Sequence, residues 1–179
     1  MKRIIFIFAI LAIASILPAQ AQESPYLDFQ NREIKALSSG DIESLLEGKG
    51  MGFALAAELN GLPGPKHVLD MSSDLGLTAE QLQRTRSIYD AMLDSAVATG
   101  KLVVEKEREL DTLFANGDAT VDSVRYLSAE IGKLNGQLRA GHLSAHIEMI
   151  HVLSHDQRLK YQALRGYTGG ATHDHSRAH

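Results

Sequence analysis

Leu77–Gln81 (LTAEQ) has the pattern of a helix start, and the same pattern returns at Leu153–Gln157 (LSHDQ). In each copy a hydroxyl residue is followed three positions later by Gln. This is the spacing of a capping box, in which the hydroxyl and the Gln side chain each satisfy a free backbone N–H at the helix start. Both helices are therefore predicted to begin at a fixed residue, and the stretch between the two patterns decides the fold.

Two long helices are predicted over this stretch. Residues 78–115 contain no proline and a single glycine, and their apolar residues fall on one stripe at about 100° per residue. Asn116-Gly117-Asp118 predicts a turn, and residues 120–153 form the second helix. Its apolar stripe consists of Val124, Leu127, Ile131, Leu134 and Leu138. Three glycines of this helix either allow a close helix–helix approach or simply loosen it: Gly132, Gly136 and Gly141.

Shorter helical patterns flank this hairpin. They cover residues 39–46, 51–59 and 66–75, and Pro63-Gly64-Pro65 predicts a turn between the last two. A final short helix is predicted from the LSHDQ pattern to near Arg165. The predicted fold class is all-α, a long antiparallel helical hairpin with short flanking helices. The helical domain spans residues 39–166, after a flexible lead-in at 22–38 and before a disordered, His-containing tail at 167–179.

The first 21 residues have the pattern of a secretory signal peptide. Lys2 and Arg3 precede an apolar run over residues 4–17, and Ala19-Gln20-Ala21 matches the small-x-small cleavage pattern. The apolar run is shorter than the roughly 20 residues that a transmembrane helix needs. We therefore expect cleavage after Ala21, a periplasmic location and no transmembrane segment in the mature form.

Composition excludes several classes of function. The chain has 22 acidic and 18 basic residues, a net charge of −4, which argues against nucleic acid as a partner. It has no cysteine, so disulfides and thiolate metal sites are excluded. No nucleophile elbow, phosphate loop or His-Glu-x-x-His motif is present, and the protein is not predicted to be an enzyme. Because only short helices are available to cover the long apolar stripes, a homodimer is expected.

A set of candidate metal ligands lies near the end of the second long helix. His142, His146 and Met149 fall within about 60° of one another on a helical wheel. Imidazoles at i and i+4 can reach one cation, and Met supplies a softer ligand. Glu58 and His67 from the short helices could complete a site for Zn, Ni, Co or Cu. Alternatively, these are histidines at the edge of the core that hydrogen bonds satisfy, with Glu58 as one partner.

The paired patterns, the signal peptide and the hairpin resemble the Spy/CpxP group of small periplasmic proteins, over about residues 51–165. That group includes zinc-resistance-associated proteins and the CnrX-like heavy-metal sensors. The resemblance implies a hooked, four-helix, dimeric fold. It also implies one of three roles: a concave surface for unfolded proteins, restraint of a membrane-bound stress kinase, or metal binding through His and Met. The pair of early-helix histidines of the metal-sensor branch is absent from this chain.

Two hypotheses follow. The first is a periplasmic stress-response protein, an ATP-independent chaperone or adaptor that binds unfolded proteins or a membrane-bound sensor protein and needs no cofactor. The alternative is a heavy-metal-binding sensor or resistance protein that uses His142 and His146. If Glu58 or His67 converges on the two histidines, the metal hypothesis gains support. If they lie far apart beside an exposed apolar groove, the chaperone hypothesis gains support.

Overall fold

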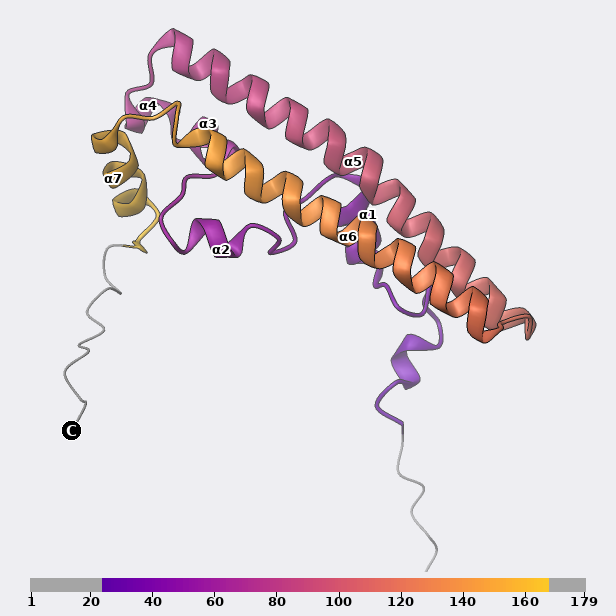
Figure 1. The fold of residues 1–179 in the computed structure, drawn as a ribbon. Coiled ribbons are helices and arrows are strands. Elements are labelled where there is room, and N and C mark those ends of the chain that lie inside the picture. Colours follow the sequence, from indigo (N-terminus) through magenta and orange to yellow (C-terminus); the bar gives the residue numbers. More distant parts are fainter. Residues whose placement is uncertain (1–23, 168–179) are drawn as a thin grey trace, which may run out of the picture.

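The computed structural model describes residues 24–167, which fold into helices joined by turns, with one isolated β-bridge between Ile34 and Leu37 (Figure 1). The predicted all-α class is confirmed. None of the described helices combines the length and the apolar character needed to cross a membrane. The predicted signal peptide and nearly all of the tail lie outside the described residues. The elements are the 3-10 helix η1 (Leu27–Phe29), α1 (Ser39–Leu46), α2 (Leu55–Glu58), α3 (Pro65–Asp70), α4 (Ser72–Leu75), α5 (Ala79–Asn116), α6 (Val121–Met149) and α7 (His155–Leu164).

Helices α5 and α6 form the long antiparallel hairpin that the sequence predicts (Figure 1). Helix α5 starts at the Thr78 capping box and ends at Gly117, whose left-handed backbone (φ 75°) turns the chain. Helix α6 starts at a capping box of Thr120 and Ser123 and ends at Met149, four residues before the predicted end. The short helices lie along one side of this hairpin.

The two capping glutamines, Gln81 and Gln157, contact each other across the fold. Each accepts a hydrogen bond from the backbone N–H of its own capping residue, Thr78 (3.0 Å) or Ser154 (2.9 Å). The side-chain amides also pair, with Nε2 of Gln81 2.8 Å from Oε1 of Gln157 and the reverse pair at 3.0 Å. Nε2 of Gln81 donates as well to the carbonyl of Val152 (2.9 Å). The first turns of α5 and α7 are thereby joined to each other.

Two predicted short helices are partly wrong. Of residues 51–59 only Leu55–Glu58 is helical, because Met51 (φ 43°) and Gly52 (φ 79°) take left-handed backbone conformations that interrupt a helix. Residues 66–75 form two helices, α3 and α4, which meet at Met71. The chain from α1 to α3 therefore consists of short helices joined by non-helical backbone, and is not one continuous helix.

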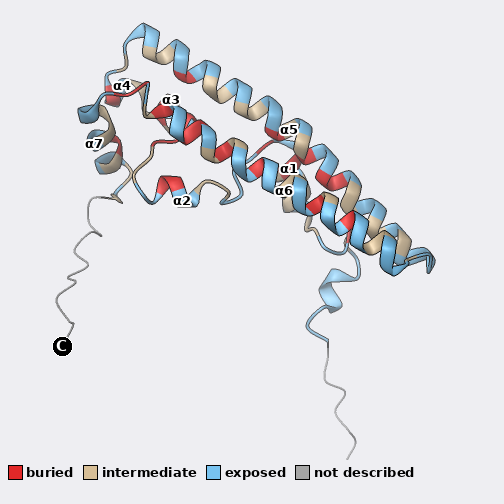
Figure 2. Cartoon of the chain, viewed as in Figure 1, coloured by how far each residue is buried: buried red, intermediate tan, exposed pale blue. Residues whose placement is uncertain are grey.

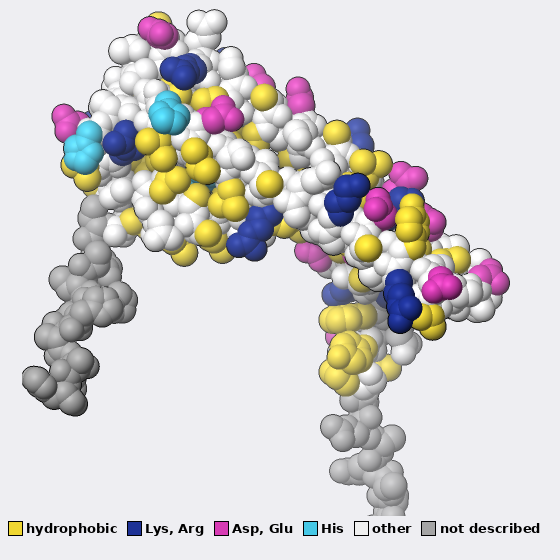
Figure 3. Space-filling view, viewed as in Figure 1, with side chains coloured by type: hydrophobic (Ala, Val, Ile, Leu, Met, Phe, Trp, Pro, Cys, Tyr) yellow, Lys and Arg dark blue, Asp and Glu magenta, His cyan; other side chains and the backbone are white. Residues whose placement is uncertain are grey.

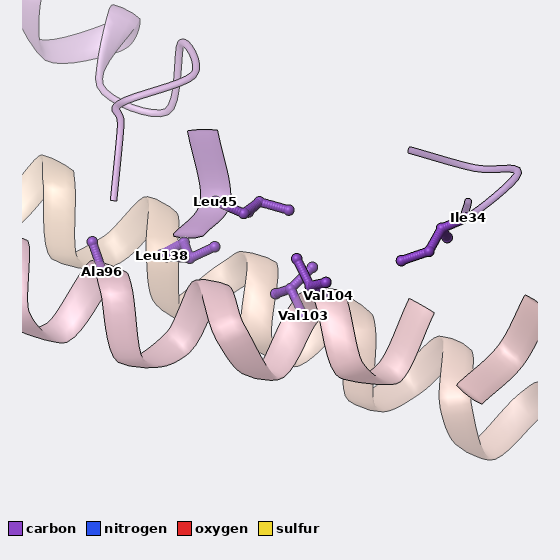
Figure 4. Close-up of a cluster of buried hydrophobic side chains, with 6 residues drawn as sticks. All are labelled: Ile34, Leu45, Ala96, Val103, Val104 and Leu138. Atoms are coloured by element: carbon purple, nitrogen blue, oxygen red, sulfur yellow. The ribbon is translucent and has the colours of Figure 1, made fainter. Parts of the chain in front are cut away.

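Buried residues form two clusters along the hairpin, and exposed residues cover most of the outer surface and the hairpin turn (Figure 2). The first cluster lies under α1 and contains Ile34, Leu45, Ala96, Val103, Val104 and Leu138 (Figure 4). The second lies where α3, α4 and α7 meet the end of α6 and contains Val68, Leu75, Met149, Val152, Leu153 and Tyr161. In the expected lead-in, Ile34 is fully buried and the N–H of Lys35 donates to Asp111 of α5 (3.0 Å). This part of the lead-in is packed on the hairpin.

The close approach between helices occurs at Gly100, where the end of α1 meets α5. A Cβ at this position would lie 2.8 Å from the carbonyl carbon of Leu45 and 3.3 Å from its Cα. On α6, a Cβ at any of three glycines would have no neighbour within 4 Å: Gly132, Gly136 and Gly141. These three glycines loosen α6 and are not packing sites.

We predict that Gly100→Ala and Gly136→Ala change stability in opposite directions. The first forces the Leu45 backbone away from α5 and should lower the free energy of unfolding by about 1–3 kcal/mol, as overpacking does. The second removes a flexible residue from an open helix position and should raise it by up to about 1 kcal/mol. Denaturant unfolding of both variants measures this, and an equally stable Gly100→Ala protein would contradict the packing described.

Candidate functional site

One pocket of about 410 Å³ brings together four of the five candidate ligands. His142 and His146 reach it from α6, Glu58 from α2 and His67 from α3. The loop over residues 47–52 and parts of α5 complete its wall. Met149 does not line this pocket. Its side chain is fully buried in the second core cluster, against the ends of α3, α4 and α7.

His146 is held in one orientation by the backbone. Its Nδ1 lies 2.9 Å from the carbonyl oxygen of Leu62. Because a carbonyl can only accept, Nδ1 carries the proton, and in the neutral ring the lone pair is on Nε2. That nitrogen faces Gly64, since a Cβ at Gly64 would lie 3.0 Å from Nε2 and 3.5 Å from Oε2 of Glu58. A backbone carbonyl that fixes the tautomer in this way is typical of metal-binding histidines.

His142 lies one turn earlier on α6 and is only 5% exposed. Its ring stacks on Phe53, with ring centroids 5.9 Å apart. Its Nε2 is buried and has no hydrogen-bond partner among the described residues. Leaving such an atom unpaired costs about 1–3 kcal/mol. Burial, and then the nearby His146, lower the pKa of His142, so its ring is neutral at neutral pH.

Glu58 is a buried carboxylate whose two oxygens have different surroundings. Oε1 accepts hydrogen bonds from the Tyr161 hydroxyl (2.7 Å), Nε of Arg165 (2.9 Å) and the Tyr167 hydroxyl (3.0 Å). Oε2 shares the Tyr161 hydroxyl (2.8 Å) and lies 3.8 Å from Nδ1 of His146. One oxygen is therefore saturated by donors from the C-terminal end of the domain, and the other is on the side of the histidines.

The three donors to Glu58 are functional candidates that the sequence analysis missed. Tyr161 and Arg165 occupy ordinary positions of an amphipathic helix, and they lie 103 and 107 residues from Glu58 in sequence. No local spacing connects them. The one sequence signal is the grouping of Tyr161, Arg165 and Tyr167 near the C-terminal end of the domain, since together they can donate several hydrogen bonds to a buried carboxylate.

The arrangement is a partial coordination sphere. Within residues 24–167, no three His, Asp or Glu side chains lie close enough together to hold a metal ion as they stand. His67 is half-buried on the pocket wall, and its pKa is lowered by burial and by the charge of Arg165. The site thus combines His146, whose ring is oriented by a backbone carbonyl, with His142, which has an unpaired buried nitrogen. The carboxylate of Glu58 and the imidazole of His67 line the same pocket.

Comparison with known protein families, with curated proteins and with solved structures finds no match for this chain. The resemblance to the Spy/CpxP group therefore depends on the sequence patterns alone, and the pocket has to be interpreted from its own chemistry.

We predict that the metal-free domain loses stability as the pH falls below about 6.5, the ordinary pKa of histidine. The pKa of His142 is lower in the folded state than in the unfolded chain, so below that pH the unfolded chain binds more protons. Burial disfavours the charged form of this ring, and the neighbouring His146 disfavours it further. His142→Gln should flatten the decline. Denaturant unfolding with a chelator between about pH 7.5 and 5 measures it, and parallel curves for both proteins would contradict the assignment.

Proposed function

We propose that this protein is a periplasmic, Spy/CpxP-like metal-binding sensor that holds a divalent transition metal ion at His142 and His146, with Glu58 as oxygen ligand. The proposal is carried by the orientation of His146, whose N–H is given to the Leu62 carbonyl and whose Nε2 lies beside Gly64 on the pocket wall. The unpaired, buried Nε2 of His142 one turn away supports it. Glu58 lies beside the same ring, with Oε2 3.8 Å from the protonated Nδ1 of His146, so the carboxylate would have to turn toward Nε2 to share an ion with it.

The donor set determines the class of metal. Two imidazoles and a carboxylate suit Zn, Ni, Co or Cu, whereas Mg and Ca prefer all-oxygen sites. His67 lines the same pocket and supplies a further imidazole there. A role in binding and signalling is more consistent with this site than catalysis, because Glu58 is already occupied by three donors and is not free to act as a general base.

The finer architecture is part of the proposal. We infer a hooked four-helix arrangement that forms a homodimer, as in the group that the sequence resembles. Large apolar residues exposed around the hairpin turn support an interface there: Phe114, Val121 and Tyr126. The periplasmic location follows from the signal-peptide pattern of residues 1–21.

Calorimetric titration of the tag-free mature chain with Zn, Ni, Co and Cu tests the site. We expect one site per chain. Either His142→Ala or His146→Ala should lower the metal affinity by more than roughly 10–100-fold, which is the usual effect of losing a residue that only hydrogen-bonds to a metal ligand. Gly64→Ala should weaken it while removing no ligand, because the new methyl group would occupy the space between Nε2 of His146 and Glu58. The backbone of Gly64 (φ −85°, ψ 138°) accepts alanine without strain.

Two matched controls accompany this titration. His151→Ala removes an exposed histidine next to the end of α6, and deletion of residues 168–179 removes the tail histidines. Neither should change the affinity. If the tail deletion abolishes binding and His142→Ala does not, the proposed site does not exist.

A chaperone or adaptor role is the second candidate. Hydrophobic side chains gather over α2 and the end of α6, and on the N-terminal segment (Figure 3). Helix α2 packs on α6, and large apolar residues are exposed on α2 (Leu55), directly after it (Leu59) and on α6 (Ile147). An exposed apolar surface of this kind can bind segments of an unfolded chain or a partner protein.

The second candidate predicts that the mature protein, at near-stoichiometric ratio and without ATP, suppresses light scattering from an aggregating client. The double variant Leu59→Ser/Ile147→Ser should lose most of this effect because it removes apolar surface from both helices. Tyr126→Ser, which removes an exposed apolar side chain at the other end of the hairpin, is the control. Absence of suppression with several unrelated clients would eliminate this role.

A further inference from the structure

Residues 54–62, which contain α2, border the pocket but contribute little to the core. Within this segment only Ala57 and Glu58 are buried. Leu55 is 54% exposed and Leu59 63%. Among the residues that the structure describes, neither core cluster includes a side chain of this segment. Burial of apolar surface therefore does little to hold these residues in place.

The chain is anchored on either side of this segment. Phe53, directly before it, packs against the first core cluster. Pro63, directly after it, is fully buried. Residues 54–62 thus form a loop between two fixed points, and they can move without displacing either anchor.

Hydrogen bonds hold the segment to α6 and to the C-terminal end of the domain. The Glu58 carboxylate accepts from three donors in α7 or directly after it: Tyr161, Arg165 and Tyr167. Backbone carbonyls of the segment lie 2.9 Å from Nδ1 of His146 and 3.2 Å from Nε2 of Gln162. Because water can replace all of these partners, breaking them costs little net free energy. Opening also returns the Glu58–Arg165 ion pair to solvent, which recovers the desolvation that a buried pair costs.

The segment closes off the two histidines of α6. His142 and His146 are only 5% and 7% exposed, although both line the pocket. Leu55 and Glu58 of the segment line the same pocket, and α2 packs on α6. The carbonyl of Leu62 binds the His146 ring directly. A dissolved molecule or ion therefore reaches the two rings freely only when this segment moves away.

We propose that residues 54–62 are a lid that opens to admit solutes to His142 and His146, and that Glu58 is the latch that keeps the lid closed. Helix α2 has four residues and no side-chain cap at its start. It does not remain helical once it leaves α6, because so short a helix is unstable alone. Opening of the lid therefore costs less free energy than unfolding of the long hairpin. The inference concerns access to the pocket and does not require a bound metal ion.

Chemical modification of the metal-free mature chain tests the lid. Diethyl pyrocarbonate acylates neutral imidazole nitrogens, and peptide mass spectrometry reports each histidine separately. In wild type, the exposed His151 and His155 should react fast and the two covered histidines slowly. Glu58→Gln removes the charge of the latch and should raise the modification rates of His142 and His146 about 10–100-fold. The rate at His151 should not change.

A second variant and two matched controls accompany this measurement. Arg165→Gln loosens the same latch from a half-buried position, so it tests the lid even if Glu58→Gln fails to fold. Glu148→Gln and Arg139→Gln make the same chemical changes at exposed positions of α6. Both controls should leave every histidine as reactive as in wild type.

Hydrogen exchange separates opening of the lid from unfolding of the domain. In wild type, the amides of residues 57–62 should exchange faster than those of residues 127–138 in the middle of α6, because the lid opens while the hairpin stays folded. Glu58→Gln or Arg165→Gln should speed exchange at residues 57–62 and leave residues 127–138 unchanged.

Three results would overturn the lid. One is a wild-type protein in which His142 and His146 react as fast as His151, since the histidines would then be open to solvent already. Another is equal protection of residues 57–62 and the middle of α6, which would mean that the segment opens only with the whole domain. The third is a pair of folded latch variants, Glu58→Gln and Arg165→Gln, in which modification and exchange are the same as in wild type.

Discussion

The pairing of Gln81 with Gln157 is the constraint on which the rest of the structure depends. Each glutamine caps its own helix, and the two amides exchange hydrogen bonds at 2.8 and 3.0 Å. Because both caps fix the first turn of a helix, the pair sets where α7 starts relative to α5 and, through the rigid helix, where its later residues lie. Tyr161, one turn after Gln157, is fully buried and reaches Glu58 only from that position. The capping interaction therefore determines the geometry of the pocket as well as the ends of two helices.

A second constraint is the backbone between Leu62 and Gly64. The Leu62 carbonyl fixes the tautomer of His146, and the missing side chain of Gly64 leaves the space between His146 and Glu58. Two buried prolines, Pro63 and Pro65, flank Gly64 and restrict the backbone conformation there, and Pro65 is also the first residue of α3. The segment between α2 and α3 thus supplies the orientation of the site, whereas the long hairpin supplies its two histidines.

Local sequence patterns predict the helices well because capping and apolar periodicity act over a few residues. The LTAEQ and LSHDQ patterns, the Gly117 turn and the His142–His146 spacing are all of this kind. Contacts between distant segments leave no such pattern. Glycine composition alone cannot show that Gly100, and not the α6 glycines, meets the Leu45 backbone. The helical wheel put Met149 beside the histidines, but one stripe of α6 faces both the pocket and the core, and Met149 lies in the core. The Glu58–Tyr161 bond spans 103 residues.

A purely structural role accounts for part of the site only. A buried glutamate with three donors is a satisfied group that ties α2 to α7, and it needs no ligand to explain it. The same argument does not extend to the histidines. The ring of His146 is fixed by the Leu62 carbonyl, which leaves the lone pair on Nε2 beside Gly64, and His142 keeps a buried Nε2 unpaired at a cost of about 1–3 kcal/mol. An apolar residue at position 142 would pack against Phe53 without that cost. Two imidazoles one helical turn apart, one with a lone pair on Nε2 and the other with an unpaired buried nitrogen, are the observations on which the proposed metal site rests.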